Sequence, residues 1–219
     1  MHIPDGFLDL KIAAILYTVS IVAIAISVVR TRKTLGDKQI PLLSLLTAGV
    51  FAAQMLNFPI VGGTSGHLVG GTLIAVFLGP SATVVSMTVI LVIQGLVFAD
   101  GGITALGANI FNMGVIPALT FFLYVAIKRG VKGRKGILTG AAVVAWLSVV
   151  LGAVACGLEL GFSYPTFLYN SWVTVPMMAF WHVIIGVGEA IITSSILAYV
   201  LTTRPDLLSL AKTPPKEVK

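Results

Sequence analysis

The chain has 219 residues, of which 57% are apolar and only 10% are charged, and its mean hydropathy is +1.03. Soluble domains carry about 25% charged residues, so this chain has too few charges to cover a surface that faces water. We therefore expect an integral membrane protein. It should consist of one membrane-embedded domain over residues 1–203 and a short polar cytoplasmic tail over residues 204–219, without a separate soluble domain.

Seven apolar runs, separated by glycine, proline and charged residues, each predict a membrane helix. A span needs about 20 residues, and the third run is shorter than that. The predicted fold class is all-α: a polytopic membrane protein with seven transmembrane helices over residues 7–29, 40–57, 67–78, 81–98, 108–127, 137–160 and 173–201.

The basic residues predict the orientation of these helices. Every lysine and arginine except Lys11 falls after the first helix, between the fifth and sixth, or after the seventh. With seven spans, those three places lie on one side of the membrane, which the positive-inside rule assigns to the cytoplasm. We expect the N-terminus outside and the C-terminus in the cytoplasm. The pI near 9.6 then reflects orientation, and not a nucleic-acid partner.

The first seven residues, MHIPDGF, offer metal ligands. No cleavable signal is recognisable, so Met1 is expected to keep a free amine. The Met1 amine, the His2 backbone nitrogen and the His2 Nδ1 can close two chelate rings if a metal displaces the amide proton, and another histidine would complete a planar four-nitrogen site. Such sites are typical of Ni(II) and Cu(II), whereas Zn(II) prefers tetrahedral geometry. The alternative is that His2 is an incidental polar residue at a frayed terminus.

The segment NFPIVGGTSGHLVGGTL, which begins at Asn57, contains the histidine expected as the fourth ligand. Its small residues let a loop pass close to other backbone and to a ligand. Irregular backbone at membrane depth is tolerated where it lines a cavity. His67 follows this loop, at the predicted start of the third helix. It is either the fourth nitrogen ligand or a histidine that is hydrogen-bonded at the start of a helix.

Other polar residues are candidates to support such a site. An ionisable residue inside a span costs about 2.5 to 3.5 kcal/mol, so His182 and Glu189, which share a helical face, should point into the bundle. Direct ligation and plain packing are the alternatives for His182, and Glu189 is expected to serve helix packing or a conformational change. The residues expected to orient the ligands through hydrogen bonds are Ser65, Asn112 and His182, with Gln54 as a further candidate.

The sequence lacks the signatures of a catalyst. It has no glycine-rich loop with a lysine for ATP phosphates and no Ser/His/Asp or Cys/His set, so we expect that it does not hydrolyse ATP itself. It also has no series of acids for a proton relay and no convincing internal repeat, which disfavours an inverted-repeat secondary transporter. A metal-dependent membrane hydrolase is disfavoured, because four planar nitrogens leave no obvious open in-plane position.

Four segments resemble a known family: MHIPDGF, NFPIVGGTSGHLVGG, FADGGITALGANIFNMGVIP and WHVIIGVGEAIIT. Up to about Thr202, the chain is similar to the NikM/CbiM family, the substrate-binding (S) components of the energy-coupling-factor (ECF) importers for nickel and cobalt. The resemblance implies a seven-helix protein of the cell membrane with an additional N-terminal helix. It also implies a metal held by four nitrogens, which by position are the Met1 amine, the His2 backbone nitrogen, the His2 imidazole and His67.

The resemblance also implies a non-enzymatic subunit without a cofactor, which acts together with partners. The S component of this family works with a transmembrane coupling subunit and two cytoplasmic ATPases, and a small accessory membrane protein is a further candidate. ATP hydrolysis topples the S component in the bilayer and carries the site inward. Small residues on an early helix are the expected docking surface for the coupling subunit, here Ala48 and Ala52, unless these serve only packing within the chain.

Capture of Ni(II) for import is the leading hypothesis. Within the family, Co(II) for cobalamin synthesis is the rival, and Cu(II) would bind such nitrogens more tightly than Ni(II). From a different class, the alternative is a membrane metal sensor or structural subunit that transports nothing. Because the imidazoles and the amide must lose protons to bind metal, affinity should fall steeply below about pH 6.5.

Overall fold

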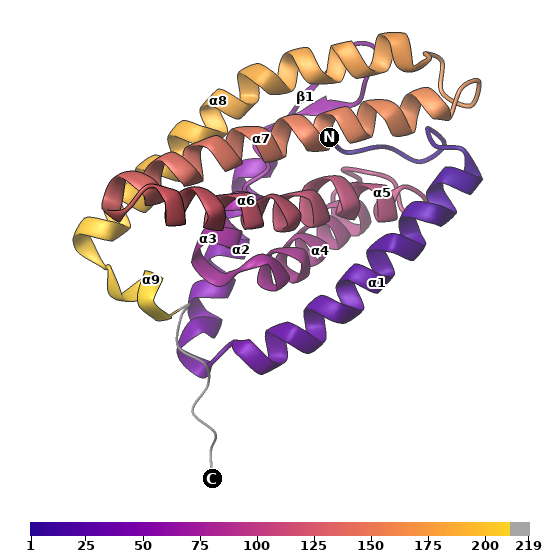
Figure 1. Ribbon diagram of the computed structural model, residues 1–219. Helices are drawn as coiled ribbons and strands as arrows, with labels where there is room; N and C mark the ends of the chain where they lie inside the picture. The colour runs from indigo at the N-terminus through magenta and orange to yellow at the C-terminus, as the bar shows by residue number, and fades with distance from the viewer. Residues whose placement is uncertain (211–219) are drawn as a thin grey trace.

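The structure, a computed structural model, describes residues 1–210, so the predicted tail lysines Lys212, Lys216 and Lys219 lie outside the described residues. Helices make up most of the chain (Figure 1). In order, the elements are α1 Leu10–Thr34, η1 Asp37–Gln39, α2 Ile40–Gln54, β1 Phe58–Pro59, β2 Ser65–Gly66, α3 Gly71–Leu78, α4 Pro80–Val97, α5 Leu106–Ile110, η2 Phe111–Val115, α6 Ile116–Gly130, α7 Gly133–Phe162, α8 Ser171–Thr203 and α9 Asp206–Leu210.

Each of the seven predicted helices has a counterpart, and the prediction of a multi-pass helical membrane protein is confirmed. Within residues 1–210, five helical segments are long and apolar enough to cross a membrane: α1, α4, the continuous segment 106–130, α7 and α8. By contrast, α2 has 15 residues and α3 only 8. That the chain crosses the membrane seven times therefore stays a prediction, as does the orientation of its termini.

The start of the third helix differs from the prediction. Helix α3 begins at Gly71, so His67 lies in the preceding loop and not in the helix. Gly70, the residue before α3, has a left-handed backbone with φ of 73° and therefore interrupts helical continuity toward His67. At the other end, Gly79 and Pro80 separate α3 from α4, because Gly79 has φ of 86° and Pro80 starts a new helix.

The helices pack as a bundle around buried apolar side chains. The two longest helices, α7 and α8, run side by side along one face, and α1 lies along the opposite face with the shorter helices between them (Figure 1). Large apolar side chains cover the outer faces of α1 and α8, as expected for contact with lipid; Leu10 is 79% exposed and Trp172 is 87% exposed. Small residues line the buried side of α1: Ala13, Ser20, Ser27 and Thr31.

The two ends of the bundle differ in chemistry. The end of α1, the α6–α7 connection and the end of α8, which carry the described basic clusters, lie toward the lower left of the bundle in Figure 1. The N-terminal segment before α1 instead folds back between the helices at the other end, where Met1 and Ile3 have no exposed surface. His2 and His67 lie together in this second region, and His182 is buried in α8.

Candidate metal centre

Residues 1–9 form an N-terminal hook whose first three residues are buried in the bundle, and the loop between α4 and α5 holds it together with Asn109 of α5. Ile3 N donates to Asn109 Oδ1 at 2.8 Å, and Asn109 Nδ2 and Gly102 N donate to Ile3 O at 3.2 and 2.8 Å. Asp5 Oδ1 accepts from the backbone and the hydroxyl of Thr104 at 2.7 and 2.6 Å. Gly6 has φ of 81°, which fits the Asp5-Gly6 turn that reverses the chain toward α1.

Close backbone approach fixes the position of this hook. A Cβ atom added at Gly102 would lie 2.2 Å from Asp5 N and 2.6 Å from the carbonyl carbon of Pro4. Any side chain at Gly102 would therefore push the hook away from the loop. Asn109 and Gly102 were not predicted as site residues, and Gly102 was expected only to break the chain between two helices. Both lie in the segment FADGGITALGANIF that carried the family resemblance.

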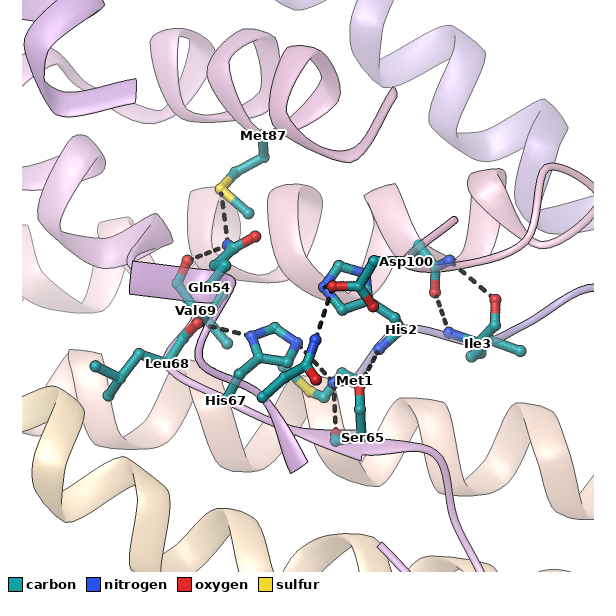
Figure 2. Close-up of polar contacts among 12 residues, drawn as sticks. Met1, His2, Ile3, Gln54, Ser65, His67, Leu68, Val69, Met87 and Asp100 are labelled. Carbon is teal, nitrogen blue, oxygen red and sulfur yellow. Dashed lines mark hydrogen bonds and ion pairs between the residues drawn. The ribbon is translucent and has the colours of Figure 1, made fainter. Parts of the chain in front are cut away.

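The hook brings the Met1 amine to the loop that contains His67 (residues 65–70, here the His67 loop). The amine nitrogen lies 2.6 Å from Ser65 O, 3.1 Å from Ser65 Oγ and 2.8 Å from His67 Nε2 (Figure 2). The His2 backbone N–H donates to Ser65 Oγ at 3.0 Å. Burial lowers the pKa of the amine from 8.0 to about 5, because the buried surroundings disfavour the charged ammonium.

Hydrogen bonding indicates which nitrogen of His67 is available. Its Nδ1 lies 2.8 Å from Leu68 O, an acceptor only, so Nδ1 carries the proton and Nε2 keeps its lone pair toward the Met1 amine. Burial, and next the charge of the N-terminal amine, hold the pKa of His67 and of His2 well below the usual range. Both rings are therefore neutral at physiological pH, the state in which imidazole binds metals.

The imidazole of His2 is buried beside that of His67. The two rings stack with centroids 4.6 Å apart and an interplanar angle of 24°. Within residues 1–210, neither ring nitrogen of His2 has a hydrogen-bond partner. Nε2 lies 3.7 Å from Asp100 Oδ2, which accepts from Asn57 Nδ2 at 2.8 Å. A buried imidazole without hydrogen-bond partners is costly unless something binds it. The lone pair of His2 Nδ1 is therefore available to bind a metal ion.

One nitrogen–nitrogen distance matches an edge of a square-planar metal site. Metal–nitrogen bonds of about 2.0 Å place neighbouring nitrogens of a square about 2.8 Å apart. The Met1 amine and His67 Nε2 are separated by 2.8 Å, the distance of one such edge. Among residues 1–210, no group of three or more His, Cys, Asp or Glu side chains could hold a metal ion. The nitrogens that the structure brings together here belong to the N-terminal amine and to His67.

The residues predicted to orient the ligands differ in their hydrogen-bond partners. Ser65 contacts both the amine and the His2 backbone. The side chain of Asn112 instead donates to Glu159 Oε2 at 2.7 Å, and Nδ1 of His182 lies 2.8 Å from Met178 O. Gln54 donates to Val69 O at 2.6 Å and so holds the His67 loop.

The candidate docking residues lie away from the centre. Ala48 and Ala52 are both exposed on α2. Ala48 borders a groove of about 460 Å³ between α2 and α4, whose lining is mostly apolar but includes the hydroxyl groups of Ser44, Thr47 and Ser86.

Three comparisons agree on the class of protein. The model of the family described as the cobalt uptake substrate-specific transmembrane region matches residues 2–207. A protein of Archaeoglobus fulgidus named as a fused nickel transport protein NikMN is 43% identical over 217 residues, covering 99% of this chain and 70% of the relative. A protein of Haloquadratum walsbyi named as a metal transport protein is 44% identical over 209 residues, covering 95% of this chain and 93% of the relative.

A solved structure matches as well. The crystal structure of a truncated transition metal transporter superposes with a TM-score of 0.85 at 32% identity, and the match covers 92% of this chain and 98% of the other. The fold described above is thus that of a known metal transporter. The chain belongs to the CbiM family of cobalt uptake substrate-specific transmembrane regions.

Proposed function

We propose that this chain is the metal-capturing S subunit of an ATP-driven ECF-type importer, and that it binds Ni(II) through four nitrogens. These are the Met1 amine, the His2 backbone nitrogen, the His2 Nδ1 and the His67 Nε2. One observation carries the proposal: the amine and the His67 Nε2, far apart in the sequence, lie 2.8 Å apart in a buried site. Membership of the CbiM family supports a role in metal uptake.

The proposed site would bind metal with release of protons. The His2 amide must lose its proton to become a ligand, and any ammonium at Met1 must become an amine. A divalent ion bound to one amide anion leaves a net charge of +1 in a buried place. Asp100, whose carboxylate is 3.7 Å from His2 Nε2, is the acid within reach to balance that charge and to orient the imidazole.

Co(II) is the second candidate cargo. The family description names cobalt, whereas the Archaeoglobus relative is named for nickel. Four planar nitrogens with a deprotonated amide favour Ni(II) over Zn(II), which prefers a tetrahedron. Cu(II) would bind still more tightly, so supply of the ion in the cell is part of the selection.

The proposal includes seven spans, with the N-terminus outside and the basic end in the cytoplasm. The coupling subunit would dock on the exposed small residues Ala48 and Ala52 beside the groove on α2. Close approach of helices in lipid depends on such small side chains. Two ATPase subunits would bind the coupling subunit and supply the energy.

Uptake of radioactive nickel tests this function. Cells that contain the chain, a coupling subunit and two ATPases should accumulate nickel, and cells with inactive ATPases should not. Cobalt offered in excess measures the preference between the two ions. If the purified chain binds nickel but the complete set never supports uptake, the chain is a sensor and the transport proposal is wrong.

A further inference from the structure

Glu189 is a buried acid that the proposed metal chemistry does not use. It lies in the middle of α8 and is 2% exposed. A carboxylate inside a membrane span is costly and is retained only with specific partners. Here both partners are backbone N–H groups of the His67 loop: Val69 N donates to Oε2 at 2.9 Å, and Gly70 N donates to Oε1 at 2.6 Å.

The first of these N–H groups belongs to the same peptide unit as the acceptor of His67. The unit that joins Leu68 to Val69 is planar and rigid. Its carbonyl oxygen lies 2.8 Å from His67 Nδ1, and its N–H donates to Glu189. One peptide unit therefore connects the carboxylate of Glu189 to the imidazole of His67.

The peptide unit that joins Val69 to Gly70 is also held by a hydrogen bond at each end. Its carbonyl, Val69 O, accepts from Gln54 Nε2 at 2.6 Å, and its N–H, on Gly70, donates to Glu189 at 2.6 Å. Val69 is 1% exposed and Gln54 has no exposed surface, so water does not compete for these bonds. The segment directly after His67 is thereby fixed by two side chains, from α2 and α8.

This arrangement resembles a known device of metal sites. A histidine that binds a metal commonly donates its other ring N–H to a carboxylate or a carbonyl, which fixes the tautomer and strengthens the ligand. Hydrogen bonds in series also polarise one another in a medium of low dielectric constant. A carboxylate that accepts from the N–H of a peptide unit makes the carbonyl of that unit a stronger acceptor.

We propose that Glu189 is a positioning residue for metal capture, acting through the Leu68–Val69 peptide unit on His67. It keeps the proton on Nδ1, holds the ring in place and presents Nε2 toward the Met1 amine. This inference rests on the proposed function, because it requires His67 to be a ligand. The competing explanation is that Glu189 only caps the N-terminus of α3, which would stabilise the fold without changing the metal site.

The test compares Ni(II) binding by full-length variants with native N-termini. Glu189→Gln keeps the shape but removes the charge, and its amide NH₂ faces an N–H donor, so at least one of the two bonds is lost. We expect the Ni(II) dissociation constant to rise about 10- to 100-fold, mostly through faster release, and the visible band of planar Ni(II) to move to longer wavelength. Gln54→Leu should also raise the dissociation constant and move the visible band to longer wavelength, each by a smaller amount.

The matched control is Ser148→Ala. It removes the 2.9 Å hydrogen bond between Ser148 and Thr72, which joins α7 to α3 without touching the His67 loop. If Glu189→Gln changes metal release and spectrum no more than this control does, the capping explanation is right and the proposal is wrong. Should Glu189→Gln fail to fold, Gln54→Leu decides in the same way, since it loosens the same segment.

A double variant separates this inference from the function on which it rests. His67→Ala should keep weak binding through Met1 and His2, and adding Glu189→Gln to it should cost nothing more. An additional loss in the double variant would contradict action through His67. If instead His67→Ala binds Ni(II) as the native chain does, His67 is not a ligand and the proposed site itself fails.

Discussion

The amine nitrogen of Met1 lies 2.8 Å from Nε2 of His67, although 66 positions separate the two residues. Two separate sets of hydrogen bonds bring these residues together. The loop between α4 and α5, together with Asn109 of α5, holds the N-terminal hook, and side chains of α2 and α8 hold the His67 loop. Hydrogen bonds to four different parts of the chain therefore keep these two nitrogens facing each other.

Removal of the fourth nitrogen is the first prediction. His67→Ala should weaken Ni(II) binding by more than about 100-fold, a greater loss than changes in residues that merely support a ligand. The remaining Met1 and His2 nitrogens should still bind the ion weakly. Isothermal titration of purified protein measures the difference, with Ser148→Ala as the control. A loss below tenfold would mean that another group supplies the fourth ligand.

Proton competition is the second prediction. The amide of His2 loses one proton to the solvent whenever metal binds, so affinity should rise by about tenfold per pH unit above pH 6. Because burial lowers the pKa of the Met1 amine to about 5 and holds both imidazole pKa values well below the usual range, these groups are already deprotonated there. Steeper loss should begin only as the pH falls toward about 5, lower than the 6.5 expected from unperturbed histidines.

The measurement is a series of Ni(II) titrations from pH 8 to pH 5. A line with a slope of one, which steepens near pH 5, fits amide ligation in a buried site. Affinity independent of pH between 8 and 6 would exclude the His2 backbone nitrogen as a ligand.

A third prediction concerns the hook. In Gly102→Ala the new methyl group would collide with the backbone of Asp5 and Pro4, at 2.2 and 2.6 Å, and displace the hook from the loop. We expect Ni(II) affinity to fall by at least tenfold, comparable to losing an orienting partner, while the helical circular dichroism stays native. The control is Gly130→Ala, where a Cβ meets nothing within 4 Å. Native affinity in the Gly102 variant would show that the hook's position does not matter.

A fourth prediction separates binding from docking. Ala52→Leu adds bulk on the exposed face of α2 and should lower nickel uptake with the partner subunits several-fold, since close helix packing needs small residues. The purified variant should bind Ni(II) like the native chain. Ala25→Leu, at an exposed position of α1, is the matched control. Equal uptake by both variants would rule out this face as the docking surface.

The sequence predicted the helices better than the residues that hold the hook and the His67 loop in place. Apolar runs and glycine–proline breaks located all seven helical segments, because the lipid environment demands long apolar stretches. The start of α3 was misplaced by four residues, since local patterns do not reveal that Gly70 takes a left-handed backbone and that Glu189 binds the loop. The antiparallel pairing of Phe58–Pro59 with Ser65–Gly66 was not expected either.

Chelate chemistry singled out Met1 and His2, because the ligand atoms there are adjacent in the sequence. The residues that hold these ligands in place are far from them in the sequence. Asn109 reaches Ile3 across 106 positions, and Glu189 reaches Val69 across 120. Glu189 was expected to serve helix packing or a conformational change, and its hydrogen-bond partners are backbone N–H groups of the His67 loop. Only the three-dimensional arrangement of the helices brings such residues together.

The central claim is that the N-terminal amine is a metal ligand, and adding one alanine before Met1 tests it most directly. The native and extended proteins would be purified, loaded with Ni(II), and compared by metal content and visible spectrum. We predict one Ni(II) with a planar d–d band in the native protein and none in the extended protein, whose Met1 nitrogen becomes a peptide amide and whose new amine is displaced. Equal metal content and identical spectra in the two proteins would contradict the claim.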